Sequence, residues 1–391
     1  MVRFTVAERR ARLARRHRLA PDARSTDVVA VAGDLAGLHA TDPATVYLSL
    51  RARTRDVDPA AIARVLYEER TVLRMIGMRR TLFVFPLDLA AIVKAACTEA
   101  IARAQRKRYA SQLEQAGIAE DGEKWLDETA EATFAALEAR GEAFGSDLSR
   151  IVPALREKIR YGEGKTWAGS VGMTSWVLFQ LAAEGRIVRG RPRGSWTGSQ
   201  WSWIPAGAWL AEPLELHDPD SARTELARRW LRAYGPALVE DLKWWSGWSL
   251  THTRSALAAA GAVEVDLEGV SGVALPDDDA PTPAPDPWAA LIPGLDPTIM
   301  GWKHRDWYLG PHAPALFDSA GNAGPSVWWN GRVVGGWAQR EGGEIVFRLL
   351  EDVGADAAAA VEADAERLAA WVGETRTLPR FRTPLERELT A

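Results

Sequence analysis

Asp34–Thr54, DLAGLHATDPATVYLSLRART, contains an imidazole, a hydroxyl and a carboxylate within four residues, at His39, Thr41 and Asp42. The mostly apolar run that precedes them, from Asp34 to Leu38, is typical of a helix. Pro43 fixes the backbone direction and suits the first turn of a following helix. The stretch therefore predicts a junction between two helices, where polar side chains can point out of the core.

The composition indicates a globular protein built from several units. At 391 residues the chain exceeds what one hydrophobic core usually organises, so about two to four units are expected. The single cysteine, Cys97, excludes an internal disulfide and a multi-cysteine metal site, and it suits a reducing compartment. The basic N-terminus lacks the apolar segment of a secretory signal, and no later run is long and apolar enough to span a bilayer. We expect a cytoplasmic protein.

Charge is distributed unevenly along the chain. Residues 1–110 carry 21 Lys and Arg against 11 Asp and Glu, a net charge of +10, whereas the remaining residues carry 27 against 41, a net charge of −14. A cationic module of this kind is expected where a protein contacts phosphates, although a solvated helix face has the same composition. The first part of the chain is therefore the candidate for nucleic-acid binding.

The first 86 residues have the pattern of a winged helix-turn-helix. Helices are expected over 5–19, over 28–38 after the capping cluster Ser25-Thr26-Asp27, and over 60–69 after Asp58-Pro59. Two β-branched or aromatic runs, 71–76 and 80–85, follow with a short turn between them. Three helices and a hairpin together predict the first unit.

The same pattern recurs twice. Residues 87–120 are expected to form a helical connector, and residues 121–212 a second winged helix whose hairpin carries Arg189, Arg191 and Arg193 among several Trp. Residues 213–275 predict a third unit, with helix breaks at Tyr234-Gly-Pro and Ser246-Gly. The expected fold class is α+β, with three tandem winged helix-turn-helix units.

A linker and a β-rich unit are expected to complete the chain. Residues 276–287 are rich in Pro and Asp, a composition too polar to pack and stiffened by its prolines. Short strands are expected within 288–391, among them Trp307-Tyr-Leu and two runs joined by the turn Asn330-Gly331, followed by a helix over 355–372. These features predict a small C-terminal β-barrel-like or open-sheet domain.

Four motifs in this order resemble one protein family. They are GLHATDP at 37–43, MRRTLFVFP at 78–86, YGPALVEDLKWWSG at 234–247 and LIPGLDPTIMGWKHRDWYLG at 291–310. Together they resemble the winged-helix DNA-binding family that includes the azinomycin-resistance DNA glycosylase AlkZ and its bacterial relatives. The resemblance implies removal of N7-alkylated purines, in some cases bulky or crosslinked, in DNA repair or genotoxin resistance.

The resemblance also implies catalytic positions. The family motif is Gln-Φ-Gln or Gln-Φ-Asp, and here His39, Ala40 and Thr41 stand in its place. A neutral imidazole can accept a hydrogen from water, so we expect His39 to act as a general base with Thr41 as a second water ligand. Asp42 is expected to orient the imidazole or to face the cationic sugar. The alternative is that these residues form a hydrogen-bonded capping cluster at a helix end. This alternative is strongest for Asp42, which precedes Pro43.

DNA contacts are expected from cationic residues near the motif, near the second hairpin and after the linker. They are Arg51, Arg53, Arg79, Arg80, Arg191, Arg193, Lys303, His304 and Arg305. We expect a monomer that binds double-stranded DNA, with no membrane association, no metal and no cofactor, because six scattered His and one Cys give no ligand spacing. The alternative is a winged-helix DNA-binding protein without catalysis, for damage recognition or regulation.

Overall fold

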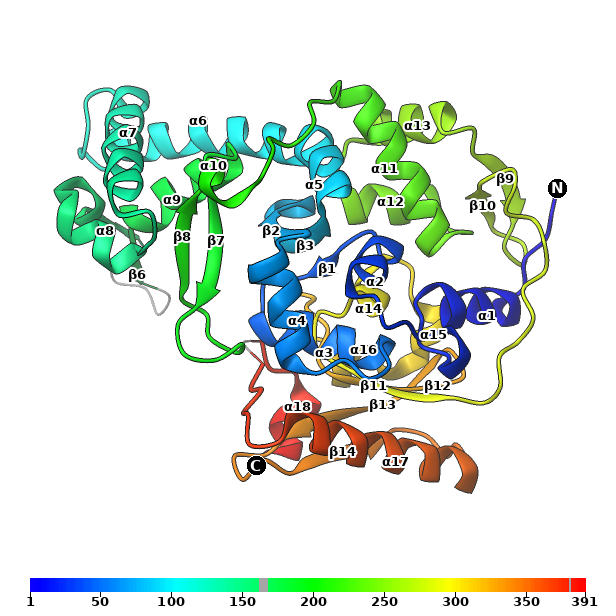
Figure 1. Ribbon diagram of the computed structural model, residues 1–391. Coiled ribbons are helices and arrows are strands. Elements are labelled where there is room, and N and C mark those ends of the chain that lie inside the picture. Colours follow the sequence, from blue (N-terminus) through cyan, green and yellow to red (C-terminus); the bar gives the residue numbers. More distant parts are fainter. Residues whose placement is uncertain (162–167, 380) are drawn as a thin grey trace.

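The computed structural model describes residues 1–161, 168–379 and 381–391. It contains helices and small antiparallel sheets (Figure 1). Helices and strands follow one another along the chain in roughly the order that the sequence predicts. No helix within the described residues has the length and apolarity needed to cross a membrane.

The N-terminal unit carries the motif on a short strand. Its elements are α1 (Val6–Arg16), α2 (Val28–Asp34), β1 (Leu38–His39), α3 (Pro43–Arg53), α4 (Pro59–Arg64) with the π-turn Val65–Glu69, β2 (Val72–Ile76) and β3 (Leu82–Pro86). The strands form an antiparallel sheet in the order β1-β3-β2. Asp27, Asp42 and Asp58 each accept a backbone N–H at a helix start, as expected from their place in the sequence.

The expected helix through Leu38 is wrong, because the chain turns before the motif. Helix α2 ends at Asp34, and Ala36 (φ 50°) and Gly37 (φ 109°) both adopt positive φ. A side chain at Gly37 would place its Cβ 2.3 Å from Cε1 of Phe85, so the close approach to β3 requires glycine. The motif therefore enters as strand β1, in which His39 pairs with Phe83 of β3.

The second unit extends away from the rest at the end of a long helical connector (Figure 1). The connector consists of α5 (Leu87–Val93), a π-turn (Lys94–Thr98) and α6 (Glu99–Gln115). The unit itself contains α7 (Gly122–Arg140), β4 (Ala143–Phe144), α8 (Gly145–Ile151), β5 (Lys158–Tyr161), β6 (Gly169–Gly172), α9 (Met173–Ala183), β7 (Ile187–Pro192), β8 (Trp201–Pro205) and α10 (Ala206–Trp209). The hairpin β7–β8 returns toward the first unit, where β7 contacts β2.

The third unit and the C-terminal unit complete the chain. The third contains α11 (Pro219–Tyr234), α12 (Val239–Ser246), α13 (Leu250–Ala259), β9 (Val263–Asp266) and β10 (Ser271–Ala274). The C-terminal unit contains β11 (Ala289–Ile292), α14 (Pro297–Met300), α15 (Asp306–Leu309), α16 (Ala313–Leu316), β12 (Ser326–Trp329), β13 (Arg332–Gln339), β14 (Ile345–Leu349), α17 (Ala355–Val372) and α18 (Pro384–Leu389). Helices followed by a hairpin thus occur three times, and their assignment to the winged-helix class stays a prediction.

Two expectations for the C-terminal unit need correction. Of the two alternatives for the sheet, the open sheet is confirmed and the β-barrel-like one is wrong. The four strands, in the order β11-β12-β13-β14, are too few to close, and α17 packs against the sheet. The run Trp307-Tyr-Leu is helical, within α15, because its aromatic side chains pack in a cluster with Trp302. Tertiary packing here outweighs strand propensity.

The Pro- and Asp-rich linker is fixed to the N-terminal helix, contrary to the expectation that it does not pack. Asp278 accepts hydrogen bonds from Arg12 at 2.6 Å and from Arg16, and the backbone N–H of Thr282 donates to Glu8 at 2.8 Å. The main hydrophobic core is continuous across the linker, since it includes residues from Leu13 in α1 to Leu389 in α18. The first, third and C-terminal units therefore share one core.

Candidate active site

A small pocket forms where the first, third and C-terminal units meet. It has a volume of about 60 Å³ and is lined by His39, Met78, Arg79, Thr81, Phe83, Tyr234, Trp245, Pro297, Met300 and Asn322. We call it the His39 pocket. Its lining comes from residues 39, 78–83, 234–245 and 297–322, so segments far apart in the sequence meet at the motif residue His39.

The His39 side chain is buried and electrostatically neutral. The residue is 7% exposed, and its ring contacts Phe83 edge to face at a centroid distance of 5.0 Å. Burial, and to a smaller extent the nearby Arg79, lowers the pKa of His39 to about 4, while Asp296 partly opposes the shift. Its Nδ1 is buried without a hydrogen-bond partner among the described residues. Such a nitrogen is costly unless a ligand or water completes it.

Thr41 shares this property, and Asp42 does not. The Thr41 hydroxyl, two residues after His39 and beyond the end of β1, is likewise buried without a partner among the described residues. Thr41 is not among the residues that line the His39 pocket. Asp42 accepts the backbone N–H of Ala44 at 3.0 Å as the N-cap of α3. Asp42 therefore serves as a helix cap, as the capping alternative expects, and a catalytic role for it stays a prediction.

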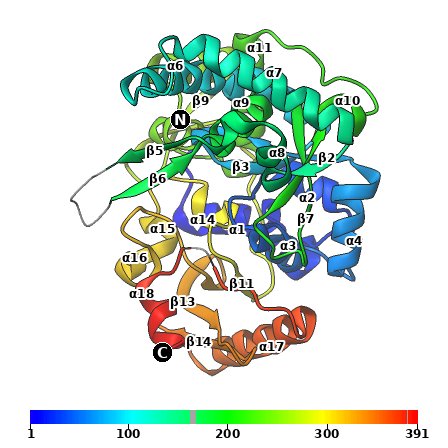
Figure 2. The same cartoon turned by 90° about the vertical axis from the view of Figure 1, so that its left-hand side faces the viewer.

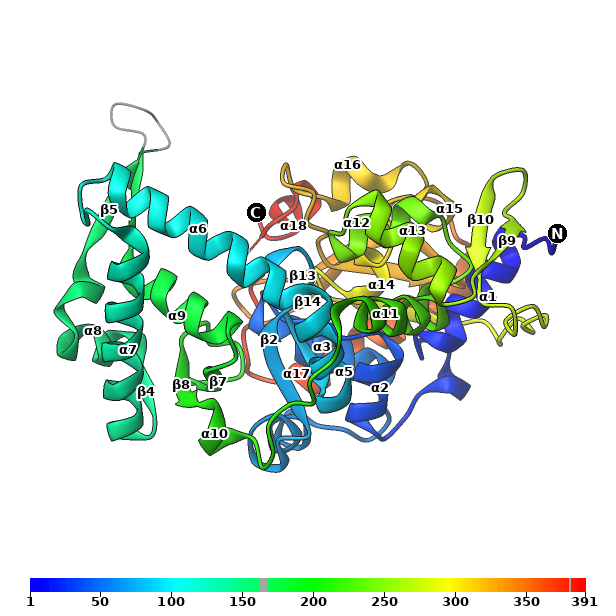
Figure 3. The same cartoon turned by 90° about the horizontal axis from the view of Figure 1, so that it is seen from above.

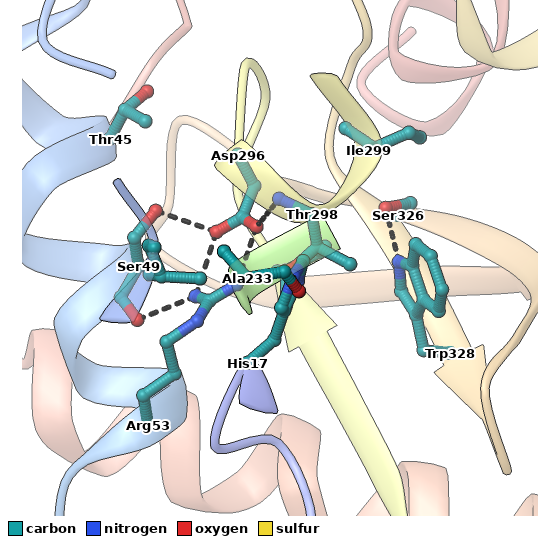
Figure 4. A network of polar contacts seen from close by, with 12 residues as sticks. His17, Thr45, Ser49, Arg53, Ala233, Asp296, Thr298, Ile299, Ser326 and Trp328 are labelled. Carbon is teal, nitrogen blue, oxygen red and sulfur yellow. Dashed lines mark hydrogen bonds and ion pairs between the residues drawn. The ribbon is translucent and has the colours of Figure 1, made fainter. Parts of the chain in front are cut away.

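A buried ion pair positions the wall of the pocket. Arg53 donates to both oxygens of Asp296 at 2.6 and 2.9 Å, and both side chains are fully buried (Figure 4). Asp296 also accepts from Ser49 Oγ at 2.6 Å and caps α14, the helix that supplies Pro297 and Met300 to the pocket. Burial opposes ionisation of Asp296, but Arg53 outweighs it and lowers the pKa of the carboxyl.

Two arginines near the motif are consequently not surface groups. Arg53 is 0% exposed, and Arg51 is 8% exposed in its ion pair with Asp364 at 3.0 Å. Their guanidinium groups bind carboxylates of the C-terminal unit, so they hold that unit against α3. This corrects the expectation that Arg51 and Arg53 contact DNA.

A second buried histidine lies behind this ion pair. His17 in the turn after α1 donates through Nε2 to the carbonyl of Ala233 at 3.1 Å, which leaves Nδ1 to accept from the hydroxyl of Thr298 at 2.8 Å (Figure 4). Burial lowers the pKa of His17 to about 3, and Arg53 adds to the shift. Both ring nitrogens of His17 are thus satisfied within the protein.

The turn between β2 and β3 aims Arg79 at an aromatic side chain of the third unit. Arg79 (φ 53°) and Arg80 (φ 66°) both lie in the left-handed region, which costs about 1–2 kcal/mol per non-glycine residue. The Arg79 guanidinium stacks 4.2 Å from the ring centroid of Trp244, while Arg80 donates to Gln105 at 2.8 Å. Both arginines are exposed, as expected for residues that contact a ligand.

A further arginine from the C-terminal unit stacks on the same ring. The Arg305 guanidinium lies 4.7 Å from the Trp244 centroid and 4.9 Å from that of Phe317. Arg79, Trp244 and Arg305 form what we call the arginine–tryptophan surface, which borders the His39 pocket through Arg79. Lys303 and His304 are exposed next to it, and their backbone N–H groups donate to Asp241, both at 2.9 Å. The post-linker cations and the motif are therefore brought together.

Arg191 and Arg193 of the second hairpin are exposed, and each has a contact within the protein. Arg191 forms an ion pair with Glu68 at 2.6 Å, and Arg193 stacks on Phe144 at 4.1 Å. Neither lines the His39 pocket.

Sequence reasoning missed three residues of the site. Asp296 could have been recognised from the sequence as a helix cap, because Asp296-Pro297 repeats the pattern of Asp42-Pro43. Trp244 lies in a quoted motif, but one Trp among 18 carries little information by itself. Asn322, which lines the His39 pocket and whose side-chain NH₂ donates to Asp318 at 2.8 Å, could not have been found from any sequence pattern.

The family model for AlkZ-like DNA glycosylases matches residues 32–371. Because the match covers most of the chain, the protein belongs to the AlkZ-like DNA glycosylase family.

An interstrand DNA cross-link repair glycosylase from Streptomyces sahachiroi is 28% identical over 232 residues, which are 57% of this chain and 58% of that protein. The chain thus matches less than two thirds of this relative's length. The structure of the DNA glycosylase AlkZ from the same organism superposes with a TM-score of 0.73 and 24% identity, covering 96% of this chain and 99% of that one. This likeness concerns the fold.

Proposed function

We propose that the protein is a monofunctional DNA glycosylase that hydrolyses the N-glycosidic bond of N7-alkylated purines in double-stranded DNA. The observation that carries the proposal is the buried, neutral imidazole of His39, whose Nδ1 has no hydrogen-bond partner among the described residues, at the motif position of a family member. The name of the Streptomyces sahachiroi relative, a cross-link repair enzyme, supports a substrate class that includes bulky or crosslinked adducts.

Hydrolysis of this glycosidic bond requires little protonation of the leaving base by an acidic side chain. An N7-alkylpurine already carries positive charge, so the base leaves readily and the enzyme has to position water and stabilise an oxocarbenium-like sugar. In the proposed step the water oxygen bonds to C1′ while the bond from C1′ to the purine nitrogen breaks, and its electron pair neutralises the base. His39 accepts the proton of the water, and the carbonyl oxygen of Asn322 is the second acceptor. No lysine lines the His39 pocket in the described part of the chain, which favours hydrolysis over an amine nucleophile.

The size of the pocket bears on how the lesion docks. About 60 Å³ accommodates a few water molecules and is far below the about 300 Å³ of a small-molecule site. We propose that the damaged base stays outside, against the arginine–tryptophan surface, while the sugar faces His39. A base held outside has room for a bulky substituent.

Duplex DNA with a single N7-methylguanine tests the proposal. Enzyme in excess should release the base and leave an abasic site that is cleaved by heat or alkali, and a duplex with a bulky N7 adduct should behave alike. Tight and salt-dependent binding of both duplexes without base release would contradict the glycosylase and favour the alternative, a DNA-binding protein without catalysis.

A further inference from the structure

A cavity lies within the second unit, apart from the candidate active site. It has a volume of about 380 Å³ and is bounded by the start of α8, by α9 and by the hairpin β7–β8. Figure 2 shows α8 and α9 beside this hairpin, and in Figure 3 all three lie at one end of the molecule, away from α15 and α16. The cavity shares no lining residue with the His39 pocket. We call it the hairpin cavity.

One arginine and two indole rings line the hairpin cavity together. Arg189 of β7 lies opposite Trp203 of β8, and Trp201 precedes Trp203 by two residues, so the three side chains lie on one face of the hairpin. The guanidinium carbon of Arg189 lies 4.4 Å from the ring centroid of Trp203 and 5.8 Å from that of Trp201. Arg74 of β2 contacts Trp201 from the first unit, at 5.1 Å, but does not line the cavity. The cavity wall therefore combines aromatic rings with a positive charge.

Arg189 has no acidic partner within the described residues. Its guanidinium forms no hydrogen bond or ion pair there, and neither Asp nor Glu lines the cavity in the described part of the chain. Arg191, two residues further along β7, has an ion pair with Glu68 at 2.6 Å. Oxyanions are the partners that guanidinium groups bind most strongly, through paired hydrogen bonds. The hairpin cavity therefore suits a ligand with an anionic group.

The rest of the cavity wall supplies aromatic surface and neutral hydrogen-bonding groups. Phe144 and Phe179 add two further rings, and the indole N–H of Trp201 is buried without a hydrogen-bond partner among the described residues. Ser199 and Gln200 are exposed, and neither side chain has a hydrogen bond within the same residues. A primary amide offers a donor and an acceptor side by side, which matches the edge of a nucleobase. An aromatic ring with polar edges and an attached anion therefore fits this lining.

We propose that the hairpin cavity binds an unpaired nucleotide of a DNA strand, whose base packs against the aromatic rings and whose phosphate is held by Arg189. Proteins that bind single-stranded DNA combine cations for the backbone with aromatic rings for the bases, because every base has a face that can stack. The cavity volume falls within the range of small-molecule sites. A base paired in a duplex is stacked between its neighbours and cannot enter, so the cavity selects single strands. The proposal is independent of the glycosylase activity.

Fluorescence anisotropy at one fixed salt concentration tests the proposal, with an undamaged single strand of about ten nucleotides and with a duplex of the same sequence. Arg189→Met should weaken binding of the single strand about tenfold and change duplex affinity less than about threefold, because the phosphate contact in the cavity is lost. The matched control is Arg186→Met in the same unit, since Arg186 stacks on Phe134, pairs with Glu131 and does not line the cavity. It should bind both DNAs as the wild type does.

Three results would overturn the proposal. The first is a wild-type protein that does not bind the single strand. The second is an equal loss of single-strand affinity in Arg189→Met and Arg186→Met. The third is an equal loss of single-strand and duplex affinity in Arg189→Met, since Arg189 would then contact the backbone of a duplex.

A second variant keeps the test valid if Arg189→Met fails to fold. Ser199 is exposed, so Ser199→Glu should leave the melting temperature unchanged while it places a negative charge at the cavity. We expect it to weaken binding of the single strand about fivefold through repulsion of the phosphate. Ser195→Glu makes the same change at the exposed hairpin tip outside the cavity and should weaken binding less than about twofold. Equal losses in the two variants would also overturn the proposal.

Calorimetry with deoxyadenosine monophosphate distinguishes a nucleotide of a strand from a free one. The strand adds contacts through its neighbouring phosphates, so we expect it to bind at least about 100-fold more tightly than the mononucleotide. Equal affinities that both fall in Arg189→Met would overturn the assignment to a strand in favour of a free nucleotide in the same cavity.

Discussion

His17 and His39 are both buried and both neutral at pH 7, but only one of them has partners. The two nitrogens of His17 are hydrogen-bonded to Thr298 and Ala233, and the ring lies behind the Arg53–Asp296 ion pair. His39 has a buried nitrogen without a partner among the described residues, and it lines a pocket. Depressed pKa values therefore do not distinguish a structural histidine from a catalytic one. A ring nitrogen without a hydrogen bond, in a residue that lines a pocket, is the feature that separates His39 from His17.

Arg53 and Arg74 show that an unmade hydrogen bond alone does not mark a ligand site. Arg53 is fully buried and its guanidinium is paired with Asp296, yet its Nε lacks a hydrogen-bond partner among the described residues, as do Nε and Nη1 of Arg74. His39 combines such a nitrogen with a place in the lining of a pocket. This is why we assign a ligand contact to His39, and structural roles to His17 and Arg53.

Replacing His39 should give the largest effect. His39→Ala removes the group proposed to accept the proton of the water, which typically contributes 10²–10⁴-fold to a rate. We expect single-turnover release of N7-methylguanine to fall by about that factor, with duplex affinity changed less than about threefold. An active His39→Ala protein would remove His39 from the mechanism.

His17→Ala should have the reverse effect. It leaves the Thr298 hydroxyl and the Ala233 carbonyl without partners and opens a cavity, so we expect a loss of about 3 kcal/mol in the free energy of unfolding. Urea unfolding measures this loss, and His39→Ala, measured in parallel, should lose less. The folded His17→Ala protein should release the base at a rate near that of wild type. A selective loss of rate would place His17 in the mechanism.

The pH dependence follows from the same two side chains. Because burial holds the pKa of His39 at about 4, we expect the rate constant, after subtraction of spontaneous depurination, to be level from about pH 8 to about pH 5. An imidazole with an ordinary pKa near 6.5 would lose activity below that value instead. Folding stability should also fall with acid, from about pH 6.5 toward pH 4, because the unfolded chain binds protons that folded His17 and His39 do not. A rate that halves near pH 6.5 contradicts the assignment.

Trp244→Ala should give the smallest effect. It removes the ring on which Arg79 and Arg305 stack, so we expect duplex affinity to fall about tenfold, as is typical for one aromatic contact. Fluorescence anisotropy measures it. The control is Phe134→Ala, which removes a ring under Arg186 in the second unit, away from the pocket. Equal losses in both variants would remove the arginine–tryptophan surface from the DNA interface.

Much of the local structure could be predicted from the sequence, because it depends on neighbours in the chain. The caps at Asp27, Asp42 and Asp58 and the last long helix, expected over 355–372, agree with the structure. The turn at Gly37 was missed, since only the approach of Phe85 reveals it. The position of His39 in the site was expected from the family motif, but the partners of Arg51 and Arg53 lie more than two hundred residues away. No local pattern distinguishes them from surface cations.

The most direct test of the account compares three side chains at position 39 on one duplex. Single-turnover release of N7-methylguanine is measured for the wild type, for His39→Gln, which restores the residue type that the family resemblance implies, and for His39→Ala. We predict a rate for His39→Gln within about tenfold of wild type and a rate for His39→Ala lower by at least about 100-fold, because an imidazole and an amide both accept a hydrogen bond from water. Equal rates for all three proteins would contradict the role of His39.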